Sequence, residues 1–129
     1  MPFEYTILAP QRVVYARSTD RLSASDILTL IRRLRQDPAL NPDFDSIIDM
    51  TPTQSFESTG DEIAKAASDS AFSMTSRRAM VAPDSLGYGM ARIYAAYREL
   101  RGQSAIQVFN DLRSACAWLG IDPSAIAAV

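Results

Sequence analysis

The chain has 129 residues, 47% of them hydrophobic, and a formal net charge of −2. A chain of this length builds one domain that buries roughly two-thirds of the surface its unfolded form exposes. The slightly acidic balance gives no overall basic field to attract nucleic acid or an anionic membrane surface. We therefore expect neither nucleic-acid binding nor membrane insertion.

The residue counts also limit the chemistry. The sequence has no histidine and one cysteine, Cys116. Without histidine, the usual general base near neutral pH and every histidine-dependent triad are missing. A single cysteine forms neither an internal disulfide nor a thiolate zinc cluster. We expect no catalytic residues, metal or cofactor, and interpret Cys116 as a buried core residue. Enzyme chemistry stays open only for carboxylate, tyrosine or arginine groups.

The start of the chain, Met1-Pro2-Phe3-Glu4, lacks the basic residues and apolar run of a signal peptide. No apolar run reaches the length that spans a bilayer. These features predict a cytoplasmic protein.

The first third of the chain predicts a hairpin followed by a helix. Apolar and polar residues alternate over residues 3–7, a turn follows, and residues 13–16 continue as a second strand. Ser23 is the expected N-cap of a helix to about Gln36, with Asp26 at its third position.

Strands and helices then alternate. Residues 46–50 read as a buried strand, and an alanine-rich helix is expected from about Gly60 to Ala71. After a strand over residues 78–82, Asp84 or Ser85 caps a helix that runs to Leu100.

The last part of the chain adds one more strand and helix. Residues 105–109 alternate like a strand, and Asn110 is the expected cap of the final helix. The whole order predicts one α/β domain over residues 1–122 and a C-terminal tail over residues 123–129. Its sheet of about five mainly parallel strands has an N-terminal antiparallel hairpin strand at or near one edge, together with about four helices.

The main functional signal is a twelve-residue segment that follows the strand ending near residue 50. It reads Asp-Met-Thr-Pro-Thr-Gln-Ser-Phe-Glu-Ser-Thr-Gly and places two hydroxyls, Ser58 and Thr59, before Gly60 at a helix start. With the element order, this segment resembles the STAS domain, named for sulfate transporters and anti-sigma factor antagonists. The family pattern is Asp, Leu or Met, Ser or Thr, a short stretch, then Asp-Ser-Ser/Thr-Gly. The matching positions are Asp49, Met50, Thr51, Glu57, Ser58, Thr59 and Gly60.

The resemblance implies a non-enzymatic regulatory domain that binds a protein partner, with a homodimer as a further option. In antagonists of the family, the second hydroxyl accepts a phosphate from an anti-sigma kinase, and phosphorylation breaks the complex. Carried over, the phosphoacceptor is Thr59, with Ser58 as the second candidate. The residues expected at the partner-binding rim are Asp49, Thr51, Ser55, Glu57 and Gly60.

The same hydroxyls have a structural interpretation. Ser58 with Asp61, or Thr59 with Glu62, has the spacing of a capping box. A capping hydroxyl is also one displayed at a helix start, so both interpretations are compatible.

A second candidate site follows the strand over residues 78–82. The carboxyl ends of parallel strands form the rim where open α/β sheets bind ligands. The candidate ligand-loop residues there are Asp84, Ser85, Gly87, Tyr88, Gly89 and Arg92. The alternative is a tight strand-to-helix turn.

The stretches 82–94 and 109–120 look similar to a bacterial branch of STAS-like proteins that also resembles lipid-binding CRAL-TRIO domains. This resemblance implies an alternative function, a small-molecule or lipid carrier or sensor. Its apolar cleft is expected between the helices over residues 58–72 and 86–100. Three tyrosines, Tyr88, Tyr94 and Tyr97, add aromatic area on or near one helix face, where they line a pocket or a subunit contact, or pack in the core.

Overall fold

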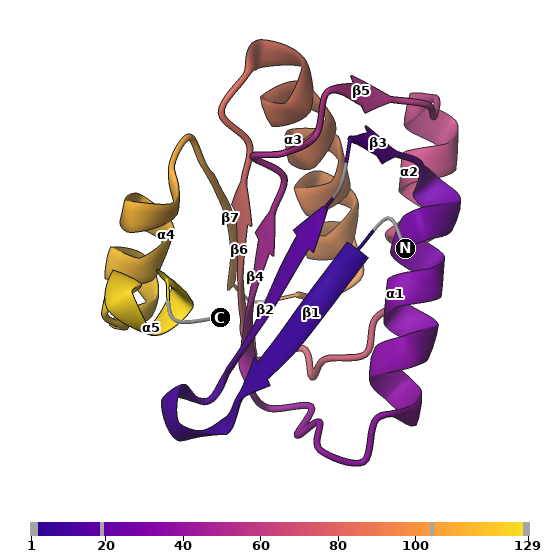
Figure 1. Ribbon diagram of the computed structural model, residues 1–129. Helices are drawn as coiled ribbons and strands as arrows, with labels where there is room; N and C mark the ends of the chain where they lie inside the picture. Colours follow the sequence, from indigo (N-terminus) through magenta and orange to yellow (C-terminus); the bar gives the residue numbers. More distant parts are fainter. Residues whose placement is uncertain (1–2, 19, 104, 128–129) are drawn as a thin grey trace.

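A five-stranded sheet forms the centre of the protein, as the computed structural model in Figure 1 shows for residues 3–18, 20–103 and 105–127. Its strands, in spatial order, are β1 (Phe3–Leu8), β2 (Val13–Ser18), β4 (Asp45–Asp49), β6 (Arg77–Val81) and β7 (Ala105–Phe109). β1 pairs antiparallel with β2, and the other neighbours pair in parallel. The predicted α/β class, mainly parallel sheet and antiparallel hairpin strand at one edge are confirmed.

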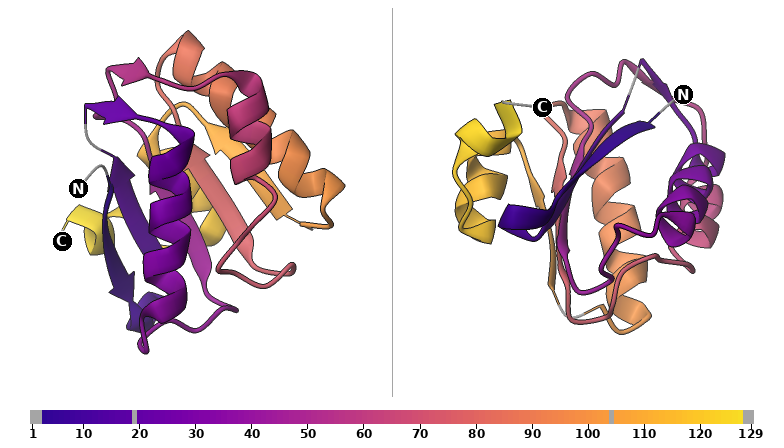
Figure 2. Two further views of the ribbon diagram at one scale, coloured as in Figure 1. Left: turned by 90° about the vertical axis from the view of Figure 1, so that its right-hand side faces the viewer. Right: turned by 60° about the horizontal axis from the view of Figure 1, so that its bottom comes forward.

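Helices cover both faces of this sheet (Figures 1 and 2). One face carries α1 (Ala24–Gln36), α2 (Gly60–Ala66) and α3 (Ser85–Leu100), and the other carries α4 (Leu112–Leu119) and α5 (Pro123–Ala127). A short 3-10 helix, η1 (Ala9–Gln11), joins β1 to β2. Successive strand residues point to opposite faces, so each central strand contributes to two cores. In β4, Ile48 belongs to the larger core under α1, α2 and α3, and Ile47 to the smaller one under α4 and α5.

The helix starts follow local capping chemistry. The Ser23 N–H donates to the Asp26 carboxylate at 2.8 Å, within the expected capping box. Asp84 caps α3 by accepting the Gly87 N–H at 2.6 Å. For α4 the prediction was wrong, because Asp111 and not Asn110 is the N-cap. Its carboxylate accepts a hydrogen bond from the backbone three residues on, as N-cap geometry requires.

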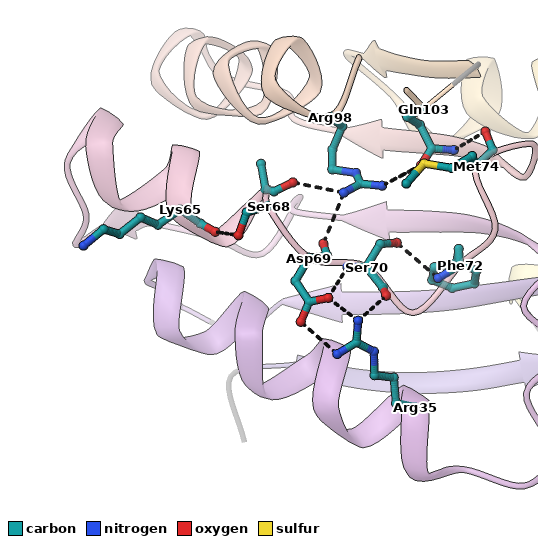
Figure 3. A network of polar contacts seen from close by, with 10 residues as sticks. Arg35, Lys65, Ser68, Asp69, Ser70, Phe72, Met74, Arg98 and Gln103 are labelled. Carbon is teal, nitrogen blue, oxygen red and sulfur yellow. Dashed lines mark hydrogen bonds and ion pairs between the residues drawn. The ribbon is translucent and has the colours of Figure 1, made fainter. Parts of the chain in front are cut away.

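α2 ends at Ala66, so the predicted helix to Ala71 was wrong. The Ser68 hydroxyl donates to the Lys65 carbonyl at 2.6 Å, and Asp69 pairs with Arg35 of α1, with Nη1 2.9 Å from Oδ2 (Figure 3). These contacts lead the chain away from a helical path. Alanine propensity is a weak preference that such tertiary contacts override.

Three elements of the described residues, β3 (Arg21–Leu22), β5 (Ser55–Phe56) and α5, were not predicted. β3 and β5 form a separate two-stranded parallel sheet. Part of the segment expected as a tail, residues 123–127, forms α5, and its Ile126 is buried in the smaller core.

Candidate functional site

Residues 50–59, here called the motif loop, leave the carboxyl end of β4 and cross the rim of the sheet. The Met50 N–H donates to the Val81 carbonyl at 2.8 Å, which continues the β4–β6 pairing beyond the strand. The loop then enters β5, which lies beside β3 at the top of the molecule in Figure 1. The Ser18 and Thr53 hydroxyls, both buried, hydrogen-bond each other and tie the loop to β2.

Asp49 fixes the beginning of the motif loop from inside the domain. Its buried carboxylate accepts hydrogen bonds from the Tyr15 hydroxyl at 2.5 Å, the Thr51 N–H at 2.9 Å and the Thr51 hydroxyl at 2.5 Å. Burial first, and then the hydrogen bond and charge of Asp49, raise the pKa of Tyr15. Asp49 therefore orients the loop, while Thr51 is the exposed member of the pair.

The two candidate hydroxyls lie in different environments. The Ser58 hydroxyl is half-buried and accepts the Ala24 N–H at 2.7 Å, so it caps the start of α1 rather than α2. Thr59 is exposed and is the N-cap of α2. Of the two, Thr59 is the hydroxyl that an enzyme approaching from solvent reaches.

Thr59 and Glu62 form a reciprocal capping box. The Thr59 N–H donates to the Glu62 carboxylate at 2.9 Å, and the Glu62 N–H donates to the Thr59 hydroxyl at 3.2 Å. Hydrogen bonds from the Thr59 backbone and then from its hydroxyl lower the pKa of Glu62. This carboxylate is therefore held as an anion at the candidate phosphoacceptor.

The remaining predicted rim residues flank this helix start. The N–H of half-buried Ser55 donates to the Asp20 carbonyl at 3.1 Å. Exposed Glu57 pairs with Arg21 Nε at 3.2 Å. Gly60 lies against α3, because a Cβ added there would meet Ile93 Cδ1 at 4.0 Å. The site thus joins α2 to α3.

The second candidate loop adjoins the motif loop. Gly87 is buried, and a Cβ added to it would lie 3.3 Å from Phe56 Cε2 and 3.0 Å from Asp84 Oδ1. Because Gly87 has no side chain, α3 can lie this close to the motif loop. An open hollow lies beside this loop. Arg92 is exposed and does not line the hollow. The hollow is lined by Pro83, Asp84, Ser85, Tyr88, Gly89 and Asn110.

An apolar stripe runs along α3. Its five side chains are spaced four and three residues apart, which places them on one helix face. Three of them are notably exposed, Leu86 at 58%, Tyr97 at 42% and Leu100 at 80%. The α3 stripe consists of Leu86, Met90, Ile93, Tyr97 and Leu100. Through Ile93 and Gly60 it is continuous with the start of α2.

The sequence analysis missed a polar group inside the larger core. Arg78 on β6 is only 4% exposed, and its guanidinium carbon lies 5.5 Å from the Phe72 ring centre and 5.6 Å from that of Tyr94. Within the described part of the chain, Arg78 Nε and Nη1 and the Tyr94 hydroxyl have no hydrogen-bond partner. Arg78 shares the inward face with Met80, so a charge two residues before a core methionine was the available sequence signal.

Two small cavities adjoin this group. The first, of about 30 Å³, lies between α1 and the sheet, with Arg78 and Tyr94 in its lining. The second, of about 20 Å³, continues toward α2 and α3. Both are lined by Leu22, Ile27, Met50, Met80 and Tyr94.

Over the described ranges, no three His, Cys, Asp or Glu side chains gather closely enough to hold a metal ion. None of the helices described combines the length and apolar character needed to cross a bilayer. Comparisons with protein-family models, curated proteins and solved structures gave no match to this chain. The resemblance of the motif loop to the STAS pattern therefore stays a prediction.

Proposed function

We propose that the protein is a non-enzymatic, STAS-like regulatory domain that binds a partner protein through the α3 stripe and the start of α2, and that Thr59 is its phosphorylation site. One observation carries this function: the exposed Thr59 hydroxyl lies at a helix start that is joined to the α3 stripe through Gly60 and Ile93. On the stripe, Leu86, Tyr97 and Leu100 are exposed, and half-buried Met90 and Ile93 lie between them. Exposed apolar side chains that gather on one face beside polar groups are typical of protein-binding surfaces.

Phosphorylation of Thr59 opposes such a complex for physical reasons. A phosphate adds nearly two negative charges at neutral pH, next to exposed Asp61 and Glu62. Glu62 is the carboxylate that pairs with Thr59 in the capping box. A phosphate on Thr59 therefore repels the capping partner of the same residue. A partner that covers the adjoining stripe also has to remove water from the phosphate, which is costly for an unpaired charge.

Affinity capture from the cells that make the protein tests this function. The five baits are wild type, Thr59→Glu, its neutral match Thr59→Gln, the stripe variant Leu86→Ser/Tyr97→Ser, and Glu99→Ser on α3 outside the stripe. We expect one protein to be retained by wild type, Thr59→Gln and Glu99→Ser. At least tenfold less of it should be retained by Thr59→Glu and by the stripe variant. Intact-mass analysis should find one phosphate on part of the wild-type chain.

Equal retention by all five baits would rule out this surface. Loss in the stripe variant alone would support the partner surface but reject Thr59 as its switch. Thr59→Ala removes the cap and the phosphoacceptor hydroxyl without adding charge, so it should cost about 1 kcal/mol of stability and still retain the partner.

A second candidate function, a small-molecule carrier or sensor, is favoured by the two cavities. They share lining residues and together follow the space between α1, α2, α3 and the sheet. The larger cavity lies under α1, whereas the cleft expected from the sequence was between α2 and α3. An apolar molecule retained in native mass spectra would support this function.

A further inference from the structure

We propose that the space between α1 and the sheet binds a monocarboxylate with an apolar chain, whose carboxylate pairs with Arg78 and the Tyr94 hydroxyl. The inference rests on the carrier function above and adds the charge and chemical class of the ligand.

The first reason is the environment of Arg78. A guanidinium removed from water is costly unless it is paired and hydrogen-bonded. The rings of Phe72 and Tyr94 stabilise the cation and restrict its position. They leave Nε and Nη1 without acceptors. A carboxylate supplies acceptor oxygens and an opposite charge at the same point.

The second reason is the charge of the surrounding core. Arg98 on α3 is 1% exposed, and burial, followed by the charge of Arg78, lowers its pKa. Its nitrogens reach the Ala67 carbonyl at 3.0 Å and the Gln103 amide oxygen at 3.2 Å, as part of the network in Figure 3. The ion pairs found among the described residues use other arginines, namely Arg21, Arg35 and Arg77. The core therefore holds two positive charges, those of Arg78 and Arg98, that take part in none of these ion pairs. A bound anion compensates this positive charge, whereas a bound cation would add to it.

The third reason is the shape of the lining. Among the described residues that line the cavity under α1, Arg78 and Tyr94 alone carry polar side-chain groups, one guanidinium and one hydroxyl, which match a single carboxylate. The other side chains that line this cavity are apolar. Ile27, Leu30 and Leu34 line it from α1. This combination is complementary to a ligand with one charged end and a hydrocarbon chain.

The ligand needs more room than the present cavities give. Volumes of about 30 and 20 Å³ hold one or two water molecules each. Met50 and Met80 line both cavities. Methionine side chains are unbranched and repack readily, so binding has to merge the cavities by rearranging them and shifting α1.

Octanoate, neutral octanol and cationic octylamine are the probes that test this inference. Binding is followed by titration calorimetry and by the methyl NMR signals of Met50 and Met80. We expect octanoate to bind wild type at least tenfold more tightly than octanol, with octylamine weakest. Arg78→Leu should lower octanoate affinity to that of octanol, and Tyr94→Phe should lower it two- to tenfold. Arg32→Leu, on the exposed face of α1, should leave it unchanged.

The outcomes separate the two proposals. If octanoate and octanol bind equally and shift the Met50 and Met80 signals, the carrier function stands and the role of Arg78 is overturned. If neither probe binds, both proposals fail. Should Arg78→Leu not fold, Arg78→Lys and Tyr94→Phe provide the test. If the charge at residue 78 binds the ligand, Arg78→Lys keeps the preference for octanoate over octanol. If Arg78 is purely structural, no such preference is seen.

Discussion

Tyr15 and Asp49 connect two neighbouring strands at the point where the motif loop begins. Burial and the hydrogen bond to Asp49 raise the pKa of Tyr15 in the folded protein. Such a tyrosine keeps its proton in the folded state after the unfolded chain has lost it. Its contribution to stability is therefore complete below about pH 10 and decreases as the pH rises above that value.

Replacing Tyr15 by phenylalanine should separate the two effects of this hydroxyl. Near neutral pH we expect Tyr15→Phe to lower the free energy of unfolding by about 1 kcal/mol, since Asp49 keeps both hydrogen bonds from Thr51. Above about pH 10 the variant should lose less stability than wild type in urea unfolding. Burial also raises the pKa of Tyr5. Tyr5 is present in both proteins and gives both the same additional dependence of stability on pH. Identical pH profiles would show that Tyr15 does not contribute.

Among the helices, the start of α1 depends on a residue of the motif loop. Ser58 accepts the Ala24 N–H, which has no acceptor within its own helix at this position. Ser58→Ala should cost about 1 kcal/mol and speed amide hydrogen exchange at Ala24 more than at Ile31 in the middle of α1. Thr59→Ala is the matched control, because it removes the cap of α2 and should leave the exchange of Ala24 unchanged. Equal acceleration at Ala24 and Ile31 would instead indicate loosening of the whole helix.

This contact also shows what the sequence can and cannot predict. Periodicity and caps such as Ser23 with Asp26 act within a few residues, and the elements they predict are present. Ser58 and Thr59 were alternative candidates for the cap of the helix that follows them. Thr59 is that cap, whereas Ser58 caps a helix whose first residue is 34 positions earlier. β3 and β5 depend on a comparable long-range pairing, and the early end of α2 depends on Arg35. The position of the motif loop could be predicted, whereas the environment of Arg78 depends on Phe72 and Tyr94, which only the fold brings to it.

At the scale of the whole molecule, the sheet separates two cores of unequal size, and α4 and α5 close the smaller one. Ile126 of α5 is 4% exposed and lies in the same cluster as Cys116 of α4. Burial raises the pKa of the Cys116 thiol, followed by the charges of Asp122 and Asp49. Both the low thiolate fraction and the cover therefore keep Cys116 unreactive in the folded protein.

Cys116 is consequently a built-in reporter of this core. Ile126→Ala should lower the free energy of unfolding by about 2–4 kcal/mol and make Cys116 react faster with a thiol reagent at constant pH. Ala127→Ser, at the exposed neighbouring position, is the control and should change neither quantity. If α5 is part of the cooperative unit, the urea transition moves as a whole and the reaction rate follows global stability. A faster reaction with an unchanged urea midpoint would mean that α5 opens alone, because Cys116 would then become accessible without unfolding of the sheet.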